Sequence, residues 1–115
     1  MADVTYRMMQ NACGLRNEAW TGGQFDLRDH IVEMVEEFGE FASNVKRLRR
    51  FQVGAATDGR TMADLNYALA NELGDMGVVL CNIANELHLD LGECVVEKFN
   101  MTSDKYGFTD HKVRP

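Results

Sequence analysis

The sequence has only one proline, Pro115 at its C-terminal end, so no proline interrupts a helix anywhere from Met1 to Arg114. Strand signals are also missing, because no segment shows sustained alternation of apolar and polar residues and no turn joins two β-rich runs. Apolar residues recur instead at helical spacing in four segments, at about 8–20, 27–50, 61–87 and 90–106. The sequence therefore predicts a single all-α domain over residues 1–115, a four-helix bundle with a polar C-terminal tail over 107–115.

Local capping signals predict where three of these helices begin. Asp26, Thr61 and Asp90 are plausible N-caps, and Thr61 has an acid three residues later, as in a capping box. In the first helix Met8, Ala12, Leu15 and Ala19 share one face, which Met9, Cys13 and Trp20 widen on one side, and this pattern predicts that the face is buried. The middle of the third helix is apolar almost all round. A single chain of 115 residues is too short to cover such a helix on every side, so we expect the protein to self-associate.

Four further features of the sequence exclude whole classes of protein. The three cysteines, at positions 13, 81 and 94, form no CxxC pair, which favours reduced thiols and argues against a disulfide framework or a zinc site. The longest apolar run, 76–81, is far too short to span a membrane. No secretory signal begins the chain, and a net charge of −6 makes it a poor ligand for nucleic acid. These features predict a cytoplasmic protein (in the host cytoplasm if it is viral) that binds neither membranes nor nucleic acid.

The second and third helices each carry an acidic pair at i,i+3 spacing, Glu37 with Glu40 and Glu72 with Asp75. Each pair projects from one helix face, and the short connection makes the two helices antiparallel neighbours. Glu72 falls inside the apolar stripe, where a carboxylate is costly unless it is paired or binds a metal. A solvated acidic face is one alternative, and a Lys or Arg partner for Glu72 or its protonation is the other. If the faces meet, four carboxylates need cations, with Asn44 and Asn82 as possible additional ligands, and oxygen ligands favour Mg²⁺, with Mn²⁺ as a substitute.

Other metal and phosphate sites lack their motifs. A di-iron carboxylate bundle needs Glu-x-x-His pairs, and none precedes His30, His88 or His111. The chain has no G-x-x-x-x-G-K-[ST] loop and no G-x-G-x-x-G segment, which excludes P-loop and dinucleotide-binding sites.

Two segments, Val35-Glu-Glu-Phe-Gly-Glu-Phe41 and Asn71-Glu-Leu-Gly-Asp-Met76, resemble the MazG-like nucleotide pyrophosphohydrolases, whose pattern is EExxE followed by ExxD on the next helix. The resemblance runs from about Leu27 to Phe108 and includes the segment from Lys98 to Tyr106 that resembles the basic end of the family's last helix. The chain departs from the family at Thr102, where many relatives have asparagine, and at Lys105, where arginine is common.

The resemblance implies Mg²⁺-dependent hydrolysis of (deoxy)nucleoside triphosphates between the α and β phosphates, giving a monophosphate and pyrophosphate. It also implies a homodimer or homotetramer. The site residues that the resemblance implies are the metal ligands Glu37, Glu40, Glu72 and Asp75, Glu36 or another nearby acid as a proton acceptor, and Lys98 and Lys105 on the phosphates, with two solvated lysines as the alternative. The residues themselves further suggest Asn82 at the metal site or the sugar and Trp20 stacked on the base. Packing in a helix contact is the alternative for Asn82, and core packing is the alternative for Trp20.

Two other functions remain open at this point. A phosphoribosyl-ATP pyrophosphohydrolase shares the helical fold and related acids. A non-catalytic helical module that binds metal through the acidic groove is the other possibility, although no acid of the motif is missing. The sequence does not indicate which base or sugar is preferred.

Overall fold

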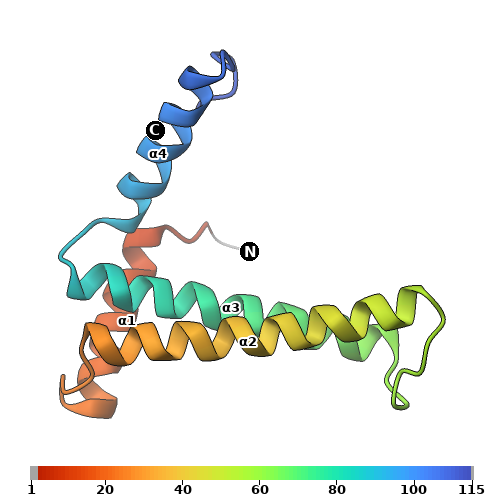
Figure 1. Cartoon of the computed structure of the whole chain (residues 1–115). Helices are drawn as coiled ribbons and strands as arrows, with labels where there is room; N and C mark the ends of the chain where they lie inside the picture. Colours follow the sequence, from red (N-terminus) through yellow and green to blue (C-terminus); the bar gives the residue numbers. More distant parts are fainter. Residues whose placement is uncertain (1–2, 115) are drawn as a thin grey trace.

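The computed structural model describes residues 3–114, and within them four helices and no strand are present (Figure 1). The helices are α1 (Tyr6–Thr21), α2 (Leu27–Gln52), α3 (Met62–Glu86) and α4 (Leu91–Lys105). The prediction of an all-α chain with four helices is confirmed. Within residues 3–114, no helix combines the length and the apolar character that crossing a bilayer requires.

Side-chain caps begin the last three helices where the sequence predicts them. Asp26 and Thr61 form capping boxes with Asp29 and Asp64, so two backbone N–H groups at each start are satisfied. The Asp90 side chain accepts from the backbone N–H of Glu93. These bonds connect residues three apart, which is why they could be read from the sequence.

The centre of the fold is the antiparallel hairpin of α2 and α3, which lie against each other along their length (Figure 1). The loop at its far end is held by Asn44, whose buried side-chain oxygen accepts from Arg47 at 3.0 Å and from Arg60 at 3.5 Å. This hairpin places the acidic pairs of the two helices on facing surfaces.

Helix α1 crosses the other end of the hairpin and is fixed there by Gln10, which is 3% exposed. The Gln10 side-chain amide donates to Asn85 Oδ1 at 3.1 Å and to the carbonyl of Leu89 at 2.9 Å, and its oxygen accepts from the N–H of Leu91 at 2.9 Å. The predicted buried face of this helix is correct only at its edge, where Cys13 is buried, and wrong at its centre, since Met8 is 54% and Leu15 is 76% exposed. Hydrogen bonds to the α3–α4 turn, which periodicity does not register, select the face that carries Gln10 and Cys13.

Helix α4 leads away from the hairpin as an arm (Figure 1), contacting α1 and α3 but not α2. An ion pair between Arg7 and Asp90 holds its first turn to α1. The predicted tail folds back along α4, where Asn100 exchanges two 2.8 Å hydrogen bonds with the backbone of Val113 and Ser103 donates to the carbonyl of His111. Residue 115, the last of the tail, lies outside the described residues.

The single chain does not close into a compact bundle. Its radius of gyration is 17.6 Å, whereas a compact domain of about this length has about 13 Å. Leu73 and Leu80, in the middle of α3, are 61% and 46% exposed. The helix that the sequence predicts to be buried on every side therefore has one apolar side exposed in the single chain. Much of the apolar surface that would form a bundle core therefore faces outward.

Candidate metal centre and nucleotide cleft

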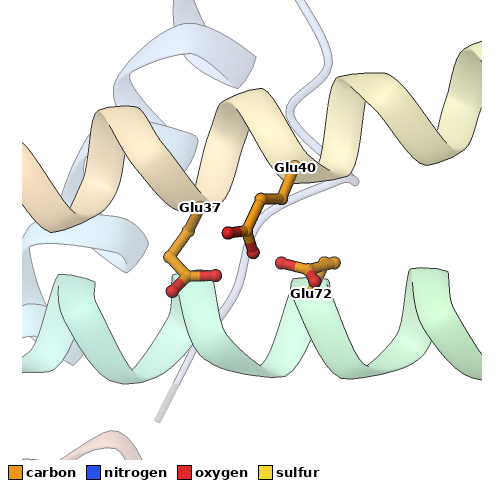
Figure 2. Close-up of side chains that lie close together, drawn as sticks. All are labelled: Glu37, Glu40 and Glu72. Carbon is orange, nitrogen blue, oxygen red and sulfur yellow. The ribbon is translucent and has the colours of Figure 1, made fainter.

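Three carboxylates meet between α2 and α3. Figure 2 shows Glu37 and Glu40 reaching from α2 toward Glu72 on α3. One oxygen from each carboxylate lies within 4.8 Å of the other two. Glu37 and Glu72 are half-buried, and each has one buried oxygen, Oε2, without a hydrogen-bond partner. We call these three residues the acid cluster.

The acid cluster carries no compensating positive charge. Within residues 3–114, the lysine and arginine ion pairs are made with Asp26, Asp90 and Asp104, and none involves the cluster. The structure therefore does not provide the basic partner that was the alternative for Glu72. An unpaired, half-buried carboxylate is costly, so this arrangement needs protons or a cation.

The raised pKa values of two acids in the cluster also indicate that it needs protons or a cation. Burial first, and then the neighbouring carboxylates of Glu72, Asp75 and Glu40, raise the pKa of Glu37 to about 7. The negative charge of Glu72 is the main reason that the pKa of Glu40 is also raised. A group whose pKa is raised by neighbouring anions holds a proton until a cation replaces it.

The remaining predicted acids lie beside the cluster. Asp75 is exposed, close enough to raise the pKa of Glu37, and forms part of a cleft that begins at the cluster. Glu36 is exposed and outside the cleft, and its charge contributes to raising the pKa of Glu40. Asn44, which the sequence offered as an additional oxygen ligand, instead uses its oxygen for Arg47 and Arg60.

The cleft has a volume of about 520 Å³ and runs between α1 and the hairpin. Its lining combines acids, amides and aromatic rings: Arg16, Asn17, Trp20, Phe25, His30, Glu33, Glu37, Asp75 and Asn82, with Cys13, Thr21, Val78 and Val79. Trp20 is 78% exposed, so it does not pack in the core of this chain, which was the alternative for this residue. The Arg16 guanidinium lies 5.0 Å from the centre of the Trp20 ring. The two predicted substrate residues, Trp20 and Asn82, thus share one cleft with Glu37 and Asp75, whereas Glu40 and Glu72 do not line it.

Lys98 and Lys105 are not brought to this site within one chain. Both are exposed on α4, which does not contact α2 and leads away from the hairpin (Figure 1). The Lys105 ammonium lies 5.4 Å from the centre of the Tyr106 ring. A role at the acids therefore requires a second chain.

Sequence reasoning missed His30 and Glu33 as parts of the site. His30 is 2% exposed, and its Nδ1 lies 3.1 Å from Glu33 Oε1. The spacing of Glu33, Glu37 and Glu40, four and three residues apart, places all three on one flank of α2 and was the available signal. Nothing in the sequence indicates that His30 is buried beside Phe25 at the edge of the cleft.

No protein-family model matches the chain, and no curated protein matches it. The resemblance described above is therefore carried by the motif residues alone.

Proposed function

We propose that this protein is a Mg²⁺-dependent nucleoside triphosphate pyrophosphohydrolase, cutting its substrate between the α and β phosphates. The observation that carries the proposal is the acid cluster, with three carboxylates within 4.8 Å of one another and buried oxygens on two of them without partners. These oxygens fit a hard divalent cation, which Mg²⁺ or Mn²⁺ would provide. The free thiols suit the reducing cytoplasm, where we place the reaction.

Glu37, Glu40 and Glu72 would hold the metal, with Asp75 completing the ligands at the mouth of the cleft. Bound Mg²⁺ would neutralise the phosphate oxygens, which the acids alone repel, and lower the pKa of an attacking water. A nearby acid would accept the proton of that water, and Glu36 is poorly placed for this because it lies outside the cleft. The protein thus contributes mainly positioning and charge, which suffice for phosphoryl chemistry.

The cleft gives the nucleoside a place beside the acids. The exposed ring of Trp20 offers a face on which a base can stack, and Phe25 lies on the same rim. Arg16, next to Trp20, supplies a positive charge among cleft residues that are otherwise acidic or neutral. This combination of an aromatic platform and a metal centre supports a nucleotide substrate over a module that only binds metal.

A second copy of the chain completes the structure in this proposal. The chain exposes 8575 Å², about 2,200 Å² more than a compact monomer of 13.0 kDa exposes. That excess is the area that each partner of an obligate dimer buries. Apolar side chains line both the hairpin and the α4 arm, including Phe38, Leu73, Leu80 and Phe99. A dimer or a dimer of dimers would cover them and could bring Lys98 and Lys105 of one chain to the acids of another.

The test is pyrophosphate release from a panel of ribo- and deoxyribonucleoside triphosphates and phosphoribosyl-ATP, with Mg²⁺ and with EDTA. We expect monophosphate and pyrophosphate as the products, and activity that requires the metal. Turnover restricted to phosphoribosyl-ATP would favour the related histidine-pathway enzyme. Metal binding without turnover of any substrate would favour the alternative that the protein is a non-catalytic metal-binding module.

A further inference from the structure

A smaller recess continues the cleft at its end away from the acid cluster. It has a volume of about 270 Å³ and shares Asn17, His30 and Asn82 with the cleft. Glu86 and His88, from the C-terminal end of α3 and the turn that follows it, form part of its wall. A ligand lying in the cleft with one end at the acids can therefore extend its other end into a polar recess.

Four polar side chains of the recess, Glu18, Asn82, Glu86 and His88, make no side-chain hydrogen bond within the described part of the chain. Of these, Asn82 and Glu86 lie on α3 in line with Asp75. The Asn85 amide is already occupied, since it accepts from Gln10 Nε2 at 3.1 Å and donates to the Gln10 carbonyl at 2.9 Å. Within residues 3–114, the side chains of Asn82 and Glu86 make no hydrogen bond. The nearest group to Glu86 is His30 Nε2, a buried nitrogen without a partner, at 4.0 Å from Glu86 Oε1. That distance is too long for a hydrogen bond, so the Glu86 carboxylate is free to accept hydrogen bonds from a ligand.

Asp75, Asn82 and Glu86 follow one another along one side of α3, seven and four residues apart. Asp75 and Asn82 are separated by about 10 Å along the helix axis, at 1.5 Å per residue. This is the length scale of a nucleoside monophosphate. A nucleotide with its reacting phosphate at the acid cluster and Asp75 would therefore have the edge of its base near Asn82 and Glu86.

We propose that Asn82 and Glu86 bind the edge of the base and select bases with an amino group at C4 of a pyrimidine or C6 of a purine, cytosine and adenine, over uracil and thymine. The proposal rests on the proposed function for the position of the phosphates. An ionised carboxylate only accepts hydrogen bonds, so Glu86 attracts the N4 amino group of cytosine or the N6 amino group of adenine and repels the O4 carbonyl of uracil or thymine. The Asn82 amide donates to the neighbouring ring nitrogen. Such a site rejects an analogue that lacks the matching donor, because the carboxylate that the base covers is then left unpaired.

The experiment compares substrates that differ only at this position, dCTP and dUTP. We expect kcat/KM to be roughly ten- to a hundredfold higher for dCTP. Binding of dCMP and dUMP, measured by titration calorimetry with Mg²⁺, should show a preference of the same direction. In Glu86→Gln the amide can donate to O4, so both ratios should fall to within about threefold of one. Glu97→Gln, the same change at an exposed position on α4, should keep the wild-type ratios.

The outcomes separate the two proposals. Hydrolysis of dCTP and dUTP at equal kcat/KM overturns base selection while the proposed function stands. Preferential binding of dCMP without hydrolysis of any triphosphate supports base selection and contradicts the proposed function. A wild-type ratio retained in folded Glu86→Gln, or no binding of either monophosphate, overturns base selection. If Glu86→Gln does not fold, as judged by circular dichroism, Glu86→Ala provides the same comparison.

Discussion

Glu72→Gln tests the acid cluster directly, because it removes one negative charge and leaves the size of the side chain unchanged. In the metal-free protein the carboxyl pKa of Glu37 is about 7, above its ordinary value of 4.5. The folded state then holds a proton that the unfolded state releases between these values, so the contribution of Glu37 to metal-free stability is largest below pH 4.5 and is lost as the pH rises through 7. Removing the Glu72 charge should therefore reduce the loss of stability at high pH.

The magnitude follows from the pKa of Glu37. The difference between 4.5 and about 7 corresponds to about 3 kcal/mol at about 1.4 kcal/mol per unit. Because the Glu37 side chain is half exposed, screening by water reduces this to about 1–2 kcal/mol. Burial of Glu37 remains in the variant and the charge of Glu72 does not, so we expect a gain of about 1 kcal/mol at pH 8. For a domain of this size that raises Tm by about 4 °C.

The assay is thermal unfolding followed by circular dichroism at one fixed protein concentration, at pH 5 and pH 8, with EDTA or with Mg²⁺. In EDTA, Glu72→Gln should melt above the wild type at pH 8 and close to it at pH 5. With millimolar Mg²⁺ the wild type should gain stability through metal binding, and the variant should gain much less and lose pyrophosphohydrolase activity. Glu97→Gln, which also removes one negative charge, controls for the overall charge of the protein.

Two results would refute the reasoning. A loss of several kcal/mol at both pH values in EDTA would mean that Glu72 pairs with a buried cation, because breaking such a pair strands its partner. Wild-type activity in Glu72→Gln, with an unchanged gain in Tm from Mg²⁺, would mean that Glu72 is not a metal ligand.

Other residues provide independent tests. Lys105→Ala should lower kcat/KM roughly ten- to a hundredfold through the loss of a charge-assisted phosphate contact, with Mg²⁺ binding intact by calorimetry, and unchanged kinetics would mean that Lys105 is only solvated. Mixing Lys105→Ala with inactive Glu72→Gln should restore activity if the lysine acts on a partner's acids, and no recovery would argue against a shared site. Gln10→Ala should lower the free energy of unfolding in urea by about 2–4 kcal/mol, since it strands several hydrogen-bonding groups, while the exposed Gln24→Ala should change it little; equal effects would contradict the role given to Gln10. Leu80→Asp should dissociate the oligomer in sedimentation velocity, whereas Val53→Asp in the loop should not, and a monomeric wild type would contradict self-association.

The sequence by itself determined the helices of this protein and the acids that face each other. Caps at Asp26, Thr61 and Asp90 act over three residues, and helical periodicity acts over a few turns, so both signals are complete in a local segment. The i,i+3 spacing of Glu37 with Glu40 is local in the same sense. Their meeting with Glu72 required only that a short connection make the two helices antiparallel.

Only the tertiary structure decided which face of α1 is buried, because the hydrogen bonds of Gln10 join residues 75 to 81 positions apart in the chain. The same holds for the exposure of Trp20 and for the burial of His30 between Glu33 and Glu86, which depends on the crossing of α1 over the hairpin. Periodicity ranks residues by apolar character within one helix. It cannot register a polar side chain that is buried because distant backbone groups satisfy it, nor an apolar one that the rest of the chain leaves exposed.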